Sequence, residues 1–179
     1  MLSANSAILL VVDIQGKLAE IMFESAKIIE NSRRLIEGVK LFDIPVFVTE
    51  QVPDKLGETR EELKPAIEGI TPYPKNTFRC YSDPAIKEVL KKSGRDQIII
   101  CGIETHVCVY QTALQLLADC FKVSLVVDAV SSRSLENKTA AIQRLGAEGV
   151  KIATTEMVLF ELQGKAEGER FRKISRLIK

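Results

Sequence analysis

The chain of 179 residues lacks the signatures of several common functions. It contains neither a GxGxxG run nor a GxxxxGK[ST] run, so a Rossmann dinucleotide site and a P-loop are without their characteristic motifs. Its four cysteines form no C-x-x-C pair, and therefore suggest neither a zinc ribbon nor a thioredoxin-like site. The chain also shows no internal repeat, no low-complexity stretch and no domain linker.

An excess of one charge sign is also missing. Lysine and arginine number 25 against 24 acidic residues, a net charge of +1 without a basic cluster, so we expect neither nucleic acid nor membrane as a partner. The first apolar run, Ala7–Val12, is followed at once by Asp13 and is not preceded by basic residues. It is too short for a signal peptide or a membrane span. We therefore predict a cytoplasmic protein with reduced cysteines.

Hydrophobic residues make up 46% of the sequence, and the length fits one domain over residues 1–179 with its own core. Short apolar runs predict buried strands at Ala7–Val12, Ile44–Thr49, Gln97–Cys101, Val123–Val127 and Val150–Ala153. Helical spacing and capping patterns predict helices near Ser25–Phe42, Thr59–Glu62, Pro84–Lys92, His106–Asp119, Ser134–Leu145, Thr154–Glu161 and in the tail. Between these, we expect a loop at Glu50–Glu58 and an irregular segment at Thr71–Tyr81. The alternation predicts a three-layer α/β/α fold with a mainly parallel, Rossmann-like sheet of about six strands.

Ligand sites of parallel sheets lie beyond the carboxyl ends of the strands. The residues that leave the predicted strands there are Asp13, Gln15, Thr49, Glu50, Gln51, the segment Gly102–Cys108, and Asp128. Chemically capable groups thus gather at one edge of the sheet. An aspartate in this position can equally cap a helix or a turn.

Cys108 stands at the predicted start of a helix, with Thr105 as a possible N-cap. Free backbone N–H groups and the helix dipole favour a thiolate there, and the same N–H groups could hold an oxyanion. The only histidine, His106, is two residues away and would point elsewhere, so Asp13 and a lysine are better candidates to activate the thiol. From spacing alone, the simpler interpretation of Cys108 as a packing residue is favoured.

Three segments resemble the isochorismatase-like cysteine hydrolase family. They are "LLVVDIQGKL", "PKNTFRCY" and "ICGIETHVCVYQTALQLLADCFKVSLVVDAVSSRS". The third segment is closest to a branch often described only as isochorismatase-domain-containing proteins. The resemblance implies a triad with Asp13 as general base, Lys75 as charge partner and Cys108 as nucleophile.

The resemblance also implies a cis peptide near Ile103–Glu104, which would aim the backbone N–H of Glu104 or Thr105 at an oxyanion. True isochorismatases lack the cysteine, so Cys108 speaks against isochorismate as substrate. Nicotinamidases of the family hold a metal through an aspartate and histidines in the loop after the second strand. Here that loop, "TEQVPDKLGETR", has no histidine, and we expect neither a metal nor another cofactor. The candidate substrate-binding residues are Gln15, Glu50, Gln51, Tyr73 and His106.

The predicted function is hydrolysis of a small-molecule amide (C–N bond) or ester through an acyl-cysteine, with a depressed pKa of Cys108. Two alternatives remain open. One is a catalytically weak or inactive member that acts as a binding or scaffold protein, and the other is a redox sensor at Cys108. Similar proteins are dimers, tetramers or octamers, so a homo-oligomer is expected.

Overall fold

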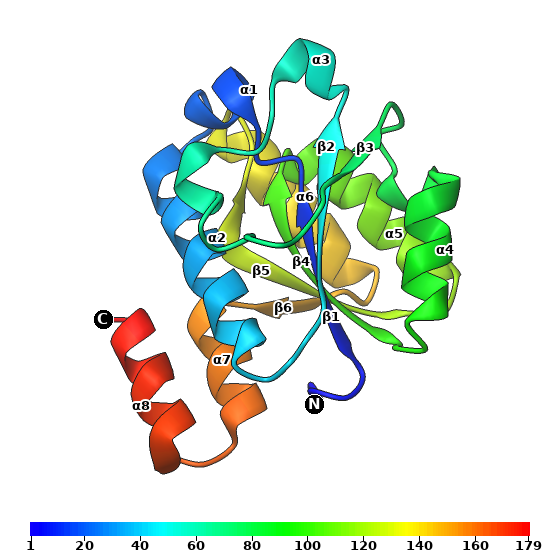
Figure 1. Ribbon diagram of the computed structural model, residues 1–179. Helices are drawn as coiled ribbons and strands as arrows, with labels where there is room; N and C mark the ends of the chain where they lie inside the picture. Colours follow the sequence, from blue (N-terminus) through cyan, green and yellow to red (C-terminus); the bar gives the residue numbers. More distant parts are fainter.

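Six parallel strands form one sheet with helices on both faces, in a computed structural model that describes residues 1–179 (Figure 1). The strands are β1 (Ala7–Val12), β2 (Val46–Gln51), β3 (Tyr73–Lys75), β4 (Gln97–Ile103), β5 (Lys122–Ser131) and β6 (Lys151–Ala153). Their order across the sheet is β3-β2-β1-β4-β5-β6, and every neighbouring pair is parallel. The predicted α/β/α architecture is confirmed.

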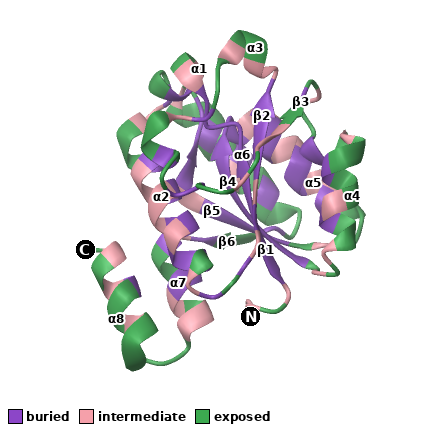
Figure 2. Ribbon diagram, in the orientation of Figure 1, coloured by how far each residue is buried: buried purple, intermediate pink, exposed green.

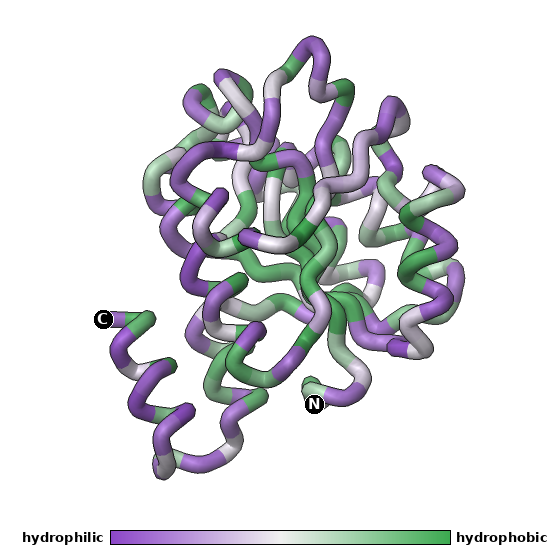
Figure 3. Tube along the Cα trace, in the orientation of Figure 1, coloured by the Kyte–Doolittle hydropathy of each residue, from purple (hydrophilic) through white to green (hydrophobic).

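The apolar runs form the inner strands because both faces of the sheet are covered. In β1, the side chains of Ala7, Leu9 and Val11 join one hydrophobic cluster, and those of Ile8, Leu10 and Val12 join the other. Figure 2 shows the strands as the buried centre of the molecule, and Figure 3 shows the most hydrophobic stretches in the same place.

The helices divide between the two faces. The first cluster packs against α2 (Ser25–Lys40), α7 (Thr155–Gln163) and α8 (Gly168–Leu177), and the second against α4 (Pro84–Lys92), α5 (Tyr110–Ala118) and α6 (Leu135–Ala147). Shorter elements are α1 (Gly16–Glu20), α3 (Pro53–Leu56), the 3₁₀ turns η1 (Glu61–Leu63) and η2 (Cys80–Ser82), and the π-helical turn η3 (Thr105–Val109). None of the helices combines the length and apolar character needed to cross a bilayer.

The helices predicted at Pro84–Lys92 and in the tail are confirmed. The side chain of Asp83 accepts hydrogen bonds from the backbone N–H groups of Ala85 and Ile86, at 3.0 and 3.3 Å, and so caps α4. The tail forms α8, which lies beside α7 in Figure 1 and buries Ile174 against the core. Both features follow from local sequence, namely a capping residue before proline and an apolar stripe.

The expectation of an irregular segment at Thr71–Tyr81 was wrong for Tyr73–Lys75, which forms β3. Pro74 fits in this strand because β3 lies at the edge of the sheet, where a missing N–H is tolerated. The pairing sets Tyr73 opposite Thr49 and Lys75 opposite Gln51. This edge strand therefore carries Lys75 to the end of the sheet where Asp13 leaves β1.

The predicted helix at Thr59–Glu62 was also wrong, because a short 3₁₀ turn begins only at Glu61. Thr59 does not cap it. Its hydroxyl donates instead to Oε1 of Glu50 at 2.7 Å. The segment expected as a loop from Glu50 contains the helix α3, and α1 was not predicted at all.

The strand order creates a switch point between β1 and β4. From β1 the chain proceeds outward to β2 and β3, and from β4 it proceeds the other way to β5 and β6. Crevices at such points, beyond the carboxyl ends of the strands, are the usual ligand sites of open α/β sheets. Asp13 follows β1 directly, and Cys108 follows β4 by five residues.

Candidate active site

Three side chains from separate elements meet at the switch point. Nζ of Lys75 lies 2.6 Å from Oδ2 of Asp13 and 4.0 Å from Sγ of Cys108. Asp13 has a left-handed backbone with φ of 52°, a conformation that aspartate tolerates better than most residues. These are the three positions to which the resemblance assigns a triad.

The ammonium of Lys75 has an oxygen acceptor for each of its three N–H bonds. These acceptors are Oδ2 of Asp13 at 2.6 Å, Oε1 of Gln51 at 2.6 Å and the carbonyl of Thr77 at 3.1 Å. An ammonium has no fourth donor. Lys75 therefore meets the sulfur of Cys108 as a nearby positive charge, while its N–H bonds hold the carboxylate.

The carboxylate of Asp13 is held from two sides. Its Oδ2 accepts from Lys75, and its Oδ1 accepts from the hydroxyl of Thr49 at 2.7 Å. Thr49 belongs to β2, next to β1 in the sheet. Two donors on different oxygens fix the plane of the carboxylate.

The site is nearly closed to solvent. Asp13 is 1% exposed, Lys75 4% and Cys108 7%. Desolvation opposes the charged form of Lys75, but its interactions with Cys80, Asp13 and Cys108 outweigh this, and the net pKa of Lys75 is raised. The ion pair thus persists in a low-dielectric environment, where charges act strongly on their neighbours.

The structure reverses the expectation of a depressed pKa for Cys108. Burial is the main cause that raises this pKa, and the negative charge of Asp13 raises it further. Lys75 lowers it, by less than these two effects together. These effects favour the protonated form of the thiol at neutral pH.

The backbone before Cys108 has an unusual course. The peptide bond between Ile103 and Glu104 is cis, at the position that the resemblance implied. The predicted N-cap was wrong, because Glu104 rather than Thr105 precedes the turn, and Thr105 is fully buried with its hydroxyl unpaired. The carboxylate of Glu104 instead accepts from the backbone N–H and Nε of Arg133, at 3.2 and 3.1 Å.

Two of the candidate substrate-binding residues act as internal supports. Gln15 is fully buried, and its amide donates to the carbonyls of Gln51 and Gly57 at 3.3 and 2.6 Å. Its Oε1 accepts from the backbone N–H of Gln51 at 2.6 Å. Gln51 in turn contacts Lys75, so the two glutamines connect β1, β2 and β3 behind the triad.

The other three candidates each contact a neighbouring side chain. Oε1 of Glu50 accepts from both the N–H and the hydroxyl of Thr59, each at 2.7 Å. The ring of Tyr73 packs edge-on against Phe47, with centroids 6.1 Å apart. Nδ1 of His106 lies 2.9 Å from the hydroxyl of Ser132.

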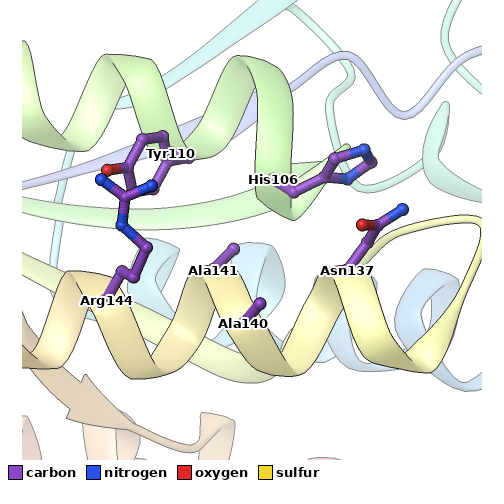
Figure 4. Close-up of a pocket in the computed structure, with 6 residues that line it drawn as sticks. All are labelled: His106, Tyr110, Asn137, Ala140, Ala141 and Arg144. Atoms are coloured by element: carbon purple, nitrogen blue, oxygen red, sulfur yellow. The ribbon is translucent and has the colours of Figure 1, made fainter.

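His106 lines a different pocket, between α5 and α6 (Figure 4). Figure 4 shows His106 and Asn137 at one end of it and Tyr110 facing Arg144 at the other, above Ala140 and Ala141. The guanidinium of Arg144 lies over the ring of Tyr110 at 5.0 Å. This pocket contains no member of the triad.

Asp128 was expected at a strand end but lies within β5, which continues to Ser131. Its Oδ1 accepts from the backbone N–H and hydroxyl of Thr155, at 2.8 and 3.0 Å. It therefore anchors the start of α7 and takes no part in the candidate site.

Cys80 is a neighbour of the site that sequence reasoning treated as unremarkable. It is fully buried, and its Sγ lies 3.7 Å from the hydroxyl of Thr49. The segment "PKNTFRCY", which carries both Lys75 and Cys80, was the available signal.

A nicotinamidase-type metal does not fit the residues that follow β2. Histidine is missing from this segment, and Oε1 of Glu50 already accepts two hydrogen bonds from Thr59. No group of three or more His, Cys, Asp or Glu side chains lies together in a way that could hold a metal ion.

Comparisons with known proteins identify the family of the chain. Residues 7–157 match the Isochorismatase domain, and the chain belongs to the isochorismatase family. It is 36% identical over 178 residues to isochorismatase domain-containing protein 2 of Danio rerio, covering 99% of this chain and 89% of the relative.

Two solved structures share the fold over nearly their whole length. One is the MAR1 ribonuclease of Caenorhabditis elegans, with a TM-score of 0.92 and 35% identity over 99% of this chain and 91% of that one. The other is an octameric hydrolase of unknown specificity from Escherichia coli, with a TM-score of 0.92 and 25% identity over 99% and 88%. The fold is that of isochorismatase-family hydrolases.

Proposed function

We propose that the protein hydrolyses a small-molecule amide or ester through an acyl-cysteine on Cys108. The observation that carries this proposal is the buried ion pair of Lys75 and Asp13, with the ammonium 4.0 Å from the sulfur of Cys108. Maintaining two charges in a nearly closed site costs free energy. That cost is understandable if the pair activates the thiol and steadies the charge that develops during reaction.

In the first step, Sγ of Cys108 attacks the carbonyl carbon of the substrate while its proton passes to the carboxylate of Asp13. The raised pKa of the resting thiol makes this transfer necessary. Lys75 remains charged and keeps the carboxylate oriented through its three N–H bonds. The tetrahedral oxyanion accepts hydrogen bonds from backbone N–H groups of Cys108 and of Glu104 or Thr105.

In the second step, the C–N or C–O bond breaks, and the leaving amine or alcohol takes the proton from Asp13. Water then attacks the acyl-cysteine, with Asp13 again accepting a proton. The second tetrahedral intermediate releases the carboxylic acid and restores the thiol of Cys108. The cycle uses one water for each bond broken and requires no cofactor.

The surroundings of Cys108 support a small acyl substrate. Cys108 is only 7% exposed, which leaves little room for a macromolecule, and the net charge of +1 gives no general attraction for polyanions. The proposal includes a cytoplasmic location and a homo-oligomer. The octameric E. coli relative supports the second part.

The test is a panel of small amides and esters, with an RNA oligonucleotide added because the C. elegans relative is named a ribonuclease. Turnover is measured by product release, and the acyl-enzyme is sought by intact-protein and peptide mass spectrometry. We expect an adduct on Cys108 and loss of turnover in Cys108→Ser. The matched control is Cys120→Ser, at an exposed cysteine, which should behave as wild type.

Full turnover by Cys108→Ser on the identified substrate would refute the proposal. Absence of any adduct or turnover across the panel, together with a stable protein partner, would favour the binding or scaffold role instead. Cleavage of the oligonucleotide without an acyl adduct would move the substrate class from acyl compounds to phosphodiesters.

A further inference from the structure

We propose that Thr49 and Cys80 are positioning residues, joined in a hydrogen-bonded relay that holds Asp13 in the orientation needed to accept the proton of Cys108. The inference rests on the proposed function, since it explains how the base is kept in place. It adds two residues that lie behind the carboxylate, on β2 and on η2.

The number of available hydrogens sets the direction of the two hydrogen bonds made by the hydroxyl of Thr49. The hydroxyl of Thr49 has one hydrogen and contacts two groups, Oδ1 of Asp13 at 2.7 Å and Sγ of Cys80 at 3.7 Å. The carboxylate accepts only, so the hydroxyl hydrogen goes to Asp13. The contact with sulfur is then a bond in which the thiol of Cys80 donates to Oγ1 of Thr49.

The environment of Cys80 keeps its hydrogen available. Burial raises the pKa of Cys80 to about 11, with the charge of Asp13 as the next cause, so the thiol stays protonated at neutral pH. Its position is fixed, because its backbone N–H donates to the hydroxyl of Thr112 at 2.9 Å and both residues are fully buried. A rigid, protonated thiol is a weak but dependable donor.

The relay decides which part of Asp13 faces the nucleophile. Thr49 occupies Oδ1 and Lys75 occupies Oδ2, so the carboxylate cannot rotate without breaking a buried hydrogen bond. The titratable groups that act on the site are Lys75 from β3, Cys80 from η2 and Cys108 from η3. Two acidic residues at the carboxyl ends of β2 and β4 are engaged elsewhere, Glu50 with Thr59 and Glu104 with Arg133.

The experiment measures two quantities for the full-length protein and its variants. One is the pH dependence of Cys108 alkylation by iodoacetamide, read by peptide mass spectrometry, which needs no known substrate. The other is kcat and KM on the substrate found in the panel. The variants are Thr49→Val, Thr49→Ser, Cys80→Ala, Cys80→Ser and Asp13→Asn. The matched control is Thr155→Val, because Thr155 also donates to a carboxylate, that of Asp128, outside the site.

The acidic limb of the profile is the pH range in which the alkylation rate of Cys108 rises with pH. For Thr49→Val we expect this limb to move to higher pH by about one unit, because the charged carboxylate of Asp13 loses a donor. kcat should fall about tenfold with KM changed less than about twofold. Thr49→Ser should restore both quantities. Cys80→Ala should move them in the same direction by less, Cys80→Ser should resemble wild type, and Thr155→Val should leave the limb unmoved.

An unmoved limb in both Thr49→Val and Cys80→Ala, or the same loss in Thr49→Ser as in Thr49→Val, would overturn the relay. If Thr49→Val does not fold, the comparison of Thr49→Ser, Cys80→Ala and Cys80→Ser decides. Asp13→Asn separates the two proposals. If Asp13→Asn shows the alkylation profile of wild type, Asp13 is not the base. If Asp13→Asn loses the acidic limb but the substitutions of Thr49 and Cys80 have no effect, only the relay is refuted.

Discussion

Replacing Lys75 by methionine removes the positive member of the buried ion pair while keeping an unbranched side chain that is one atom shorter. Asp13 would retain its charge with the donor Thr49 but without its counter-ion, in a position that is 1% exposed. The oxygens of Gln51 and Thr77 would also lose a donor. The variant therefore tests whether the pair is held together by electrostatics or merely packed.

The expected loss of stability is about 3–5 kcal/mol, the usual cost of leaving one buried charge uncompensated. Domains of this size have a free energy of unfolding of about 5–15 kcal/mol, so Lys75→Met should remain folded but unfold at a much lower urea concentration. Protonation of the unpaired carboxylate would relieve the charge. The loss should accordingly be smaller at pH 5 than at pH 8.

The assay is urea unfolding followed by circular dichroism, on wild type, Lys75→Met, Asp13→Asn and the double variant. The double variant holds no uncompensated charge, so its loss should be smaller than the sum of the single losses by about 2 kcal/mol. A loss below about 1 kcal/mol for Lys75→Met, or strict additivity in the double variant, would refute the reasoning. Either result would mean that water reaches the pair and screens it.

Three further predictions concern single positions. Burial raises the pKa of Cys101 from 9.0 to about 12, so the folded state holds this proton more tightly than the unfolded chain does. The free energy of unfolding should therefore fall by about 1.4 kcal/mol per pH unit above about pH 9. In urea unfolding at the same pH values, the fall should be shallower for Cys101→Ala. Gly102→Ala should cost about 3 kcal/mol or more in thermal or urea unfolding, because φ is +121° and a Cβ would collide with the backbone of Val12 in β1. His106→Ala should leave the alkylation rate of Cys108 within about twofold of wild type, since the imidazole faces Ser132. A tenfold fall in this rate would show that His106 acts on Cys108.

Local patterns in the sequence were sufficient to predict the central strands of the sheet. Continuous apolar runs such as Ala7–Val12 and Gln97–Cys101 have no polar face to expose and could only be buried strands. A parallel sheet then collects the residues after each strand at one edge, so the sequence predicts that Asp13 and Cys108 lie at the same edge. The helix at Pro84–Lys92 was predicted in the same way, from local spacing and capping patterns.

Edge strands and turns were harder to predict. β3 has three residues, one of them proline, and no alternation that marks it as a strand. It forms because β2 offers it hydrogen-bond partners, and those are set by the whole sheet. The turn after Thr59 likewise depends on Glu50, which competes for the threonine hydroxyl from nine residues away.

The sequence by itself determined the fold class and the edge of the sheet at which Asp13 and Cys108 lie, because these depend on periodicity and on the direction of the strands. The grouping of Lys75 with these two residues came from the resemblance to a family. Only the tertiary structure decided how the groups meet. Lys75 and Asp13 are 62 residues apart in the chain. Different elements supply the acceptors of the Lys75 ammonium and the hydrogen bonds behind Asp13. They also bury Cys108, which raises its pKa. Hydrogen-bond direction and desolvation are properties of a packed environment, and no local pattern in the sequence encodes them.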